Sequence, residues 1–338
     1  MSENMVTHFR VLVRLMRGEA TKPAERPTRC PVMRTVRALR DFQQRAFTLV
    51  ELLVVIAVVA LLVSILLPTL GRARLMGRQT RELAGGKQLM TAFTLYANDN
   101  KDRVLTGYPS AQWVATTMPV YNGEGERLYA EQAQRYPWRI APYFDGDFRG
   151  LYLDQKMLKD VRDNAPTYTP LGVNLDYVIS LFPSLGMNIN FVGGSDRLGQ
   201  FDPLFRQVFG RPYVERLDEV RRPSDLIAFA SARAEAQPLA PQLGTPDGFF
   251  RVEPPLFSAG QPRQWEASYD PRSAAPGQNS GFVALRYGGS GDGGGGGGGK
   301  AVSAQVDGHC AMLGWEDLND MRRWADGADR ADWVMTPR

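Results

Sequence analysis

The chain contains very few histidines and cysteines, the residue types that most often carry nucleophilic catalysis or bind transition metals. Among 338 residues there are two of each, namely His8, His309, Cys30 and Cys310. A zinc site or a histidine-based catalytic triad would therefore need mostly carboxylate ligands or partners, and we expect neither. Two cysteines neither indicate nor exclude an oxidising compartment.

Basic residues are not in excess over most of the chain, although the formal net charge is +4. Residues 1–46 hold ten Lys/Arg and four Asp/Glu, whereas residues 47–338 hold thirty basic and thirty-two acidic residues. The larger part is thus electrostatically ordinary and gives no reason to expect nucleic acid as a partner. Its 43% apolar and 22% charged residues suit a folded globular body.

One long hydrophobic run does stand out, from Phe47 to Leu67. Within these 21 residues only Thr48, Glu51 and Ser64 are polar. As a helix with a rise of about 1.5 Å per residue the run is about 31 Å long, which matches a hydrocarbon core of roughly 30 Å. Its length and near-continuous apolarity favour a membrane span over the buried core helix of a soluble protein. Basic residues on both flanks leave its orientation undecided by charge: Arg34, Arg37, Arg40, Arg45, Arg72, Arg74, Arg78, Arg81 and Lys87.

A single carboxylate, Glu51, sits near the start of this apolar run. An unpaired carboxylate in lipid is costly, so its presence indicates a function and a cationic partner. A new amino terminus, made by cutting the chain a few residues earlier, is the most economical candidate for that cation.

The run Arg45-Ala46-Phe47-Thr48-Leu49-Val50-Glu51, followed by the apolar helix, resembles the type IV pilin and type II secretion pseudopilin superfamily. The resemblance implies cleavage between Ala46 and Phe47 by a prepilin peptidase and methylation of the Phe47 amine. It also implies that Glu51 pairs with the Phe47 ammonium of a neighbouring subunit in a filament. Ala46 stands where the family usually has glycine; it is still small, so we expect slower processing. Pro68 falls where many pilins have proline, and we expect it to kink the helix or let it melt locally.

This resemblance divides the chain into four parts. Residues 1–46 form a cytoplasmic leader, 47–67 a single span of the inner membrane, 68–100 an amphipathic continuation of the same helix, and 101–338 a periplasmic body. A leader of 46 residues is long for the family, whereas a start at Met33 gives a 14-residue leader ending at Ala46. After assembly, the protein is expected in a periplasmic or surface filament.

The predicted fold class is α+β, with the long N-terminal helix packed on an antiparallel sheet with long loops. Apolar residues recur at helical spacing after Pro68, at Leu75, Leu83, Leu89, Met90, Phe93 and Tyr96, and the helix is expected to end at Asn98–Asn100. Gly85 and Gly86 each weaken it by about 1 kcal/mol and permit a bend. This helix end, the segment Tyr136–Tyr143 and the stretch Val306-Asp307-Gly308-His309 resemble pseudopilin-like families of planctomycete-type bacteria. The aromatics of 136–143 are expected to pack rather than to bind a ligand.

In the body, strands are expected at 177–179, 189–192, 226–230, 281–287 and 301–306. Asp307-Gly308 predicts a tight turn into a further strand at 309–313. The glycine-rich stretch 288–300 is expected to be a flexible linker rather than a phosphate-binding loop, because Ala301 follows Lys300 where that loop needs Ser or Thr. A short helix is expected at 316–324.

The function predicted from these features is that of a structural filament subunit rather than an enzyme. Its expected partners are prepilin peptidase, other pilin or pseudopilin subunits and an inner-membrane assembly platform, in a type II secretion pseudopilus or a type IV pilus-like filament. No cofactor is expected. Calcium bound by the C-terminal carboxylates Asp326, Asp329 and Asp332 is a weaker alternative, since their spacing forms no defined calcium loop.

Two other interpretations stay open at this point. The chain can be a membrane-anchored enzyme or binding module that uses the prepilin-type signal only for export, or a signal-anchored protein that is never cleaved at Ala46. Under the leading interpretation, Glu51→Ala is expected to block assembly while leaving membrane insertion intact.

Overall fold

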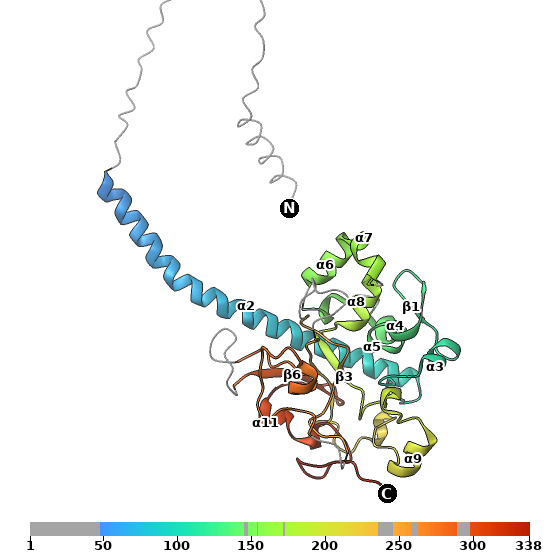
Figure 1. Ribbon diagram of the computed structural model, residues 1–338. Coiled ribbons are helices and arrows are strands. Elements are labelled where there is room, and N and C mark those ends of the chain that lie inside the picture. The colour runs from blue at the N-terminus through green and yellow to red at the C-terminus, as the bar shows by residue number, and fades with distance from the viewer. Residues whose placement is uncertain are drawn as a thin grey trace, which may run out of the picture. The chain divides into compact units, whose positions relative to one another are not determined.

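A computed structural model describes residues 48–144, 148–153, 155–171, 173–235, 246–258, 263–288 and 298–338 (Figure 1). Ala46, Phe47, the remainder of the leader and most of the glycine-rich stretch 288–300 lie outside the described residues. The chain divides into two structural units, residues 1–60 and residues 61–338. Within the first unit, the described part is Thr48 and the opening turns of one long helix.

The long helix is α2, which spans Leu49–Asp99 without interruption. It confirms the predicted continuation beyond the apolar run and the predicted end at Asn98–Asn100. Helical backbone passes through Pro68, so the chain has no melted turn there. The helix ends where Lys101 and Asp102 take positive φ angles of 59° and 61°.

Burial along α2 starts abruptly at Glu82. Of the preceding residues from 48 onward whose side chains are described, all are exposed except the half-buried Gln79. After Glu82 the predicted stripe is covered: Leu89, Met90 and Phe93 are at most 1% exposed, and Leu83 and Tyr96 are half-buried. Leu75 has the same spacing but is 41% exposed, because the body begins to cover the helix only at Glu82.

The centre of the body is a five-stranded sheet with the order β5-β3-β4-β6-β7. All neighbouring pairs are antiparallel except β3 and β5, which are parallel, so the sheet is mixed rather than purely antiparallel. The strands β3, β4 and β6 are buried along almost their whole length. Their bounds are β3 Leu185–Asn188, β4 Ile227–Ser231, β5 Arg251–Val252, β6 Lys300–Gln305 and β7 Cys310–Gly314.

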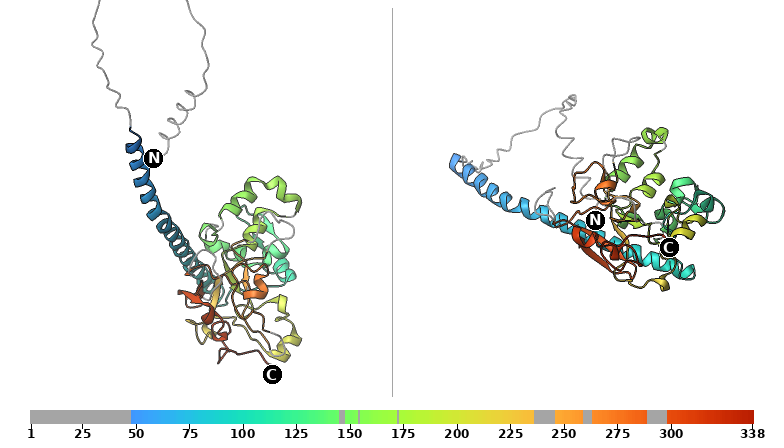
Figure 2. Two further views of the ribbon diagram at one scale, coloured as in Figure 1. Left: turned by 60° about the vertical axis from the view of Figure 1, so that its left-hand side comes forward. Right: turned by 60° about the horizontal axis from the view of Figure 1, so that its bottom comes forward.

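The last turns of α2 pack against this sheet, and both Figures 1 and 2 show the blue-green end of α2 running beside the strands. Phe93 of α2 meets Phe229 of β4 edge to face, with ring centroids 5.7 Å apart. Tyr136 stacks at a tilt on the same Phe229 ring, and its hydroxyl donates to the Leu185 carbonyl of β3 at 2.6 Å. These buried rings join the helix, the sheet and the segment that follows Arg135 into one core.

Gly85 and Gly86 allow the body to approach α2 closely. A Cβ at Gly85 would lie 2.4 Å from the Gly150 carbonyl oxygen, and one at Gly86 would lie 3.2 Å from Cys310 Sγ. The presence of glycine at these positions does not require a bend in the helix, because a side chain at either position would crowd the atom of the body that lies against it. The glycines are therefore packing residues at the junction of helix and body.

The β6–β7 hairpin confirms the turn predicted at Asp307-Gly308. Gly308 has a φ of +88°, and the ladder pairs Ala304 with Cys310 through to Lys300 with Gly314. Lys87 of α2 donates from Nζ to the Gly308 carbonyl at 2.8 Å, which fastens the turn to the helix. His309 Nδ1 lies 2.6 Å from Asp307 Oδ1 on the exposed side of the turn.

Short helices and a small hairpin surround the sheet. The hairpin consists of β1 Val120–Tyr121 and β2 Arg127–Leu128. The α-helices are α3 Ala111–Thr116, α4 Ala130–Gln134, α5 Tyr136–Ile140, α6 Gln155–Asp163, α7 Ala165–Tyr168, α8 Leu175–Leu181, α9 Pro203–Phe209, α10 Pro276–Ser280 and α11 Trp315–Leu318. The 3-10 turns are η1 Ala141–Phe144, η2 Phe148–Leu151, η3 Thr169–Leu171, η4 Asp196–Leu198, η5 Leu217–Glu219 and η7 Met321–Arg323.

Three of the strand predictions are wrong. Residues 177–179 belong to α8, whose first turn is capped by Asn174, with Oδ1 accepting from the Tyr177 amide at 2.8 Å. Residues 189–192 form the turn that follows β3 rather than a strand. Residues 281–287 make only isolated bridges, because Gly281 and Phe282 both have positive φ angles that interrupt an extended strand.

Other local predictions hold. Strand β4 matches the expected 226–230, and strand β6 matches the expected 301–306, each within one residue at both ends. The helix expected at 316–324 is split into α11 and η7, because Asp320 starts a new turn by accepting from the Arg322 amide at 2.9 Å. Tyr136 and Trp138 are buried, as expected for packing aromatics.

Candidate functional site

The start of α2 is closed by a reciprocal pair of hydrogen bonds between Thr48 and Glu51. The Thr48 hydroxyl accepts from the Glu51 amide at 3.2 Å, and Glu51 Oε2 accepts from the Thr48 amide at 2.9 Å. The Thr48 hydroxyl also donates to the same oxygen at 2.9 Å. This arrangement is a capping box, which satisfies backbone donors that the first turn of a helix leaves open.

Only one oxygen of the Glu51 carboxylate is used in this cap. Among the described residues, every hydrogen bond to Glu51 ends on Oε2 and none on Oε1. The carboxylate lies in the first turn, where the helix dipole favours a negative charge. Glu51 can thus cap its own helix and still present an oxygen to an external cation.

The apolar run that follows Glu51 is not buried against any other part of the described structure. None of the residues in its most apolar 18-residue window is buried, and α2 is the one described helix long and apolar enough to cross a membrane. Ser64 inside the run turns its hydroxyl back to the Leu61 carbonyl at 2.7 Å, so its polarity is satisfied by the helix itself. A surface of this size and composition requires lipid or other apolar helices around it.

The other site residues predicted from the sequence lie apart from Glu51. Ala46 and Phe47 are outside the described residues, so the geometry of the scissile bond is not part of the structure. Pro68 lies within α2, beyond the apolar run. Its expected role in assembly stays a prediction.

The structure adds a buried charged cluster that the sequence patterns did not single out. Glu82 is 1% exposed and takes hydrogen bonds from Arg286 Nη1 at 2.5 Å and from the Tyr287 hydroxyl at 2.5 Å. Burial and the adjoining Glu82 carboxylate raise the pKa of Tyr287 well above its ordinary value, so its hydroxyl keeps its proton and donates. The signal in the sequence was Glu82 itself, a charge about two turns before Leu89 on the apolar face.

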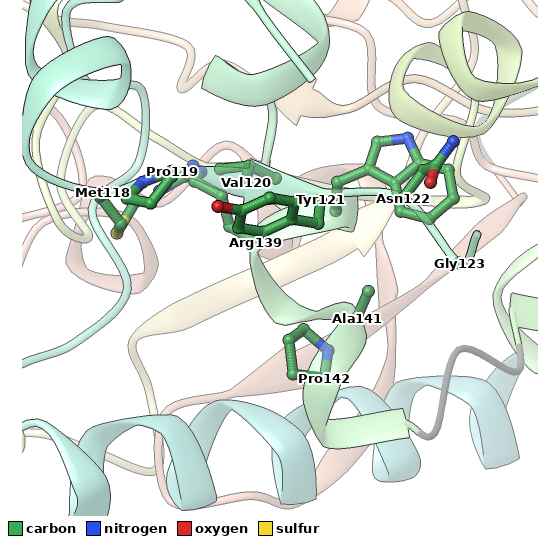
Figure 3. A pocket seen from close by; sticks show the side chains of 10 residues that line it. Met118, Pro119, Val120, Tyr121, Asn122, Gly123, Arg139, Ala141 and Pro142 are labelled. Carbon is green, nitrogen blue, oxygen red and sulfur yellow. The ribbon is translucent and has the colours of Figure 1, made fainter. Parts of the chain in front are cut away.

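A small cavity of about 330 Å³ opens beside the β1–β2 hairpin (Figure 3). It is lined by Met118, Pro119, Val120, Tyr121, Asn122, Gly123, Trp138, Arg139, Ala141 and Pro142. The lining includes no carboxylate, thiol or imidazole group, and the Tyr121 phenol is its one hydroxyl.

Arg139 is the charged residue of that lining. Its guanidinium donates to the Thr106 carbonyl at 2.6 Å and to the Gly107 carbonyl at 2.9 Å. Burial lowers the pKa of Arg139 to about 10, so the group stays charged at neutral pH. Its donors are directed at backbone oxygens, which gives it the role of holding the 106–107 segment against α5.

The C-terminal carboxylates considered for calcium are not gathered into a site in the described part of the chain. No group of three or more His, Cys, Asp or Glu residues there is placed to hold a metal ion. Asp326 instead accepts from the backbone amides of Arg221 at 2.9 Å and Arg222 at 3.2 Å. Its carboxylate thus ties the C-terminal segment to the loop before β4.

Comparison with known proteins gives one match, and it falls on the N-terminal segment. A model of the prokaryotic N-terminal methylation motif matches residues 41–67. No curated protein and no solved structure matches the chain. The matched residues include Ala46, Phe47 and Glu51 and end with the apolar run. The chain therefore carries a prepilin-type N-terminal signal, and its one described apolar helix fits a single-pass membrane anchor.

Proposed function

We propose that the chain is a pilin-like or pseudopilin-like structural subunit that is processed by prepilin peptidase and assembled into a type II secretion pseudopilus or a type IV pilus-like filament. The observation that carries this proposal is the coincidence of the methylation motif with an entirely exposed apolar helix that bears one carboxylate, Glu51. Such a helix is covered by lipid before assembly and by the helices of other subunits afterwards.

Processing makes the cation that Glu51 requires. Hydrolysis of the peptide bond between Ala46 and Phe47 leaves a carboxylate on Ala46 and an amine on Phe47, which is protonated at neutral pH. Methylation of that amine keeps its positive charge. The ammonium of Phe47 then pairs with Glu51 Oε1 of a neighbouring subunit, while Oε2 stays in the cap with Thr48.

Pairing of this kind fixes the register of the subunits. Between packed apolar helices the dielectric constant is low, so a mispaired carboxylate and ammonium cost more there than in water. Subunits whose Glu51 and Phe47 groups meet are therefore favoured over subunits shifted along the helix axis. The assembly platform in the inner membrane and the other subunits are the partners that this step involves.

The positions of the two cysteines give a direct test of processing. Cys30 lies before the proposed cleavage site, and Cys310 lies in the body. Protein purified from membranes is denatured, alkylated with iodoacetamide and weighed intact. A processed subunit begins at Phe47 and carries one alkyl group, whereas an uncleaved signal anchor is heavier by its whole leader and carries a second alkyl group when translation starts before Cys30.

Filament formation is tested separately by shearing cells and sedimenting the released material. A structural subunit appears in the sheared, high-molecular-mass fraction in its processed form. If the chain is processed but stays wholly in the membrane fraction, the proposal fails, and a membrane-anchored binding module or enzyme is the correct interpretation.

A further inference from the structure

The part of α2 between the apolar run and the body carries a group of arginines that the body does not cover. Arg72, Arg74 and Arg78 are exposed, and none forms an ion pair with another described residue. Arg81 is left out of this group because it already has an interaction partner. The three side chains are called the arginine collar below.

The collar begins directly beyond the apolar run. At about 1.5 Å per residue, Arg72, Arg74 and Arg78 lie about 8 to 17 Å past Leu67 along the helix axis. The headgroup region on each side of a hydrocarbon core is about 5 to 8 Å thick. The long side chains of Arg72 and Arg74 reach back into that layer while their stems cover apolar neighbours, and Arg78 lies within about a Debye length of about 8 Å from it.

The angular positions of the three arginines favour binding to a layer of lipid headgroups over binding to a single protein surface. At about 100° per residue, Arg74 lies about 200° and Arg78 about 240° around the helix from Arg72. The collar thus faces opposite sides of α2. A neighbouring protein surface meets one side of a helix, whereas lipid headgroups surround a helix that leaves a membrane.

We propose that the arginine collar binds anionic phospholipid headgroups in the leaflet on the side of the body. Clusters of basic residues next to a membrane span are attracted by anionic lipid, each residue contributing to the affinity. The bound headgroups hold the body at a set height above the membrane and resist withdrawal of the helix. The inference requires only that the apolar run enters a membrane, and it holds whether or not the chain forms filaments.

The experiment measures which lipid surrounds the full chain in vesicles. The protein is reconstituted in phosphatidylcholine with one-quarter phosphatidylglycerol, and spin-labelled phosphatidylglycerol or phosphatidylcholine is added as the probe. The motionally restricted fraction of each probe gives their relative association with the protein. We expect a preference of about fivefold for phosphatidylglycerol, the value of one basic residue at an anionic surface, and its loss in 1 M salt.

Two charge-matched variants make the test specific. The collar variant Arg72→Gln, Arg74→Gln, Arg78→Gln is expected to show a reduced preference, and the part that remains belongs to the arginines before the apolar run, Arg34, Arg37, Arg40 and Arg45. The control variant Lys156→Gln, Lys159→Gln, Arg162→Gln removes the same charge from exposed positions on α6 and is expected to keep the full preference. Circular dichroism and the thermal midpoint of each variant show whether the body is intact, and the comparison uses variants that match the parent protein.

Two results would overturn the proposal. The first is equal association of both probes with the parent protein, and the second is an undiminished preference in the collar variant. If the second result comes with loss of self-association of that variant, the arginines instead contact acidic side chains of a neighbouring copy. The readout comes from the chain in vesicles, so failure of filament formation in cells leaves it unaffected.

Discussion

Glu82 and Arg286, which are 204 residues apart in the chain, form a buried ion pair where the body first covers α2. The Glu82 side chain is 1% exposed and the Arg286 side chain 12% exposed. The Tyr287 hydroxyl donates to the second carboxylate oxygen, so both oxygens of Glu82 are bonded. The contact determines which turn of the helix is the first to be held by the body.

Loss of the Glu82 charge is expected to destabilise the body strongly. Glu82→Gln removes the nearer of two carboxylates beside the buried Arg286 guanidinium and leaves the more exposed Asp247, whose Oδ1 lies 3.8 Å from Arg286 Nε. Removing one partner of a buried ion pair typically costs about 3–5 kcal/mol, and the remaining Asp247 places the expected loss at the lower end of that range. Urea unfolding of the full chain in detergent, followed by tryptophan fluorescence, measures the change in free energy of unfolding. The matched control is Asp163→Asn, which breaks the exposed pair of Asp163 with Lys159 and is expected to cost less than about 1 kcal/mol. Similar losses in free energy of unfolding for the two substitutions would contradict the prediction that a buried ion pair is more costly to break than an exposed one.

Two glycines of α2 are expected to respond to alanine in different ways. Gly85→Ala places a Cβ 2.4 Å from the Gly150 carbonyl oxygen, so backbone must move, and we expect a loss of about 1–3 kcal/mol. Gly77→Ala meets no atom within 4 Å and replaces a poor helix former with a good one, so stability should not fall. Both are measured in the same urea titration. A Gly85→Ala protein as stable as the parent would show that the η2 backbone can move away from the new Cβ without lowering the free energy of unfolding.

The charge of Glu51 and its role as a helix cap can be separated by two substitutions. Glu51→Gln keeps an oxygen that can accept from the Thr48 amide but removes the negative charge, and it is expected to reduce the sheared filament fraction at least about tenfold. Thr48→Val removes the hydroxyl from the cap but leaves the Glu51 charge, and filaments are expected to form. Resistance to carbonate extraction checks that both variants stay inserted in the membrane. If Thr48→Val prevented filament formation and Glu51→Gln did not, Glu51 would act only as a helix cap.

The size of residue 46 is expected to set the rate of processing. Ala46→Gly restores the residue usual in pilin-like signals and should speed cleavage, whereas Ala46→Leu obstructs access to the scissile bond and should leave the precursor uncut. Pulse labelling gives the half-time of conversion, and the intact mass, which differs by the whole leader, identifies each form. Equal half-times for all three residues would show that the peptidase does not act at this bond.

The thiol of Cys310 is expected to react slowly at neutral pH. Burial raises its pKa, nearby Lys87 lowers it, Asp307 raises it further, and the net shift is upward. The thiolate therefore forms only at a higher pH than in an unfolded chain, and alkylation in a Cys30→Ser protein should keep accelerating above pH 9. The same reaction in urea provides the control, since there the thiol returns to its ordinary pKa. Equal rates at pH 8 with and without urea would contradict the effect of burial.

Several features follow from local sequence because their physical causes are local. A continuous apolar run of membrane length forms a helix regardless of the body. The turn formers Asn98 and Asn100 mark the end of the amphipathic helix that continues this run. The β6–β7 hairpin follows from Asp307-Gly308, since few residue pairs favour the positive φ that Gly308 adopts. The N-terminal signal is also local, since residues 45–51 and the apolar run after them are sufficient to indicate it.

The wrong predictions have different causes. The three residues Tyr177–Ile179 are apolar enough for a strand or a helix, and a local signal, the cap from Asn174, begins a helix there. The cause at 281–287 is instead a distant contact. The stretch 281–287 has residue types that suit a strand. Gly281, however, has a positive φ, and a Cβ on it would lie 2.1 Å from the Glu253 carbonyl oxygen. Such close approaches are not visible in a pattern of residue types.

The apolar helix, the prepilin-type signal and Glu51 follow from residues 45–67 alone, because length, apolarity and residue spacing are properties of one continuous segment. The contact of Glu82 with Arg286 and the close approach of Gly85 to Gly150 arise only in the folded body, because they depend on how segments far apart in the chain pack together. The folded body also leaves the collar arginines uncovered, since the continuous burial of α2 begins at Glu82.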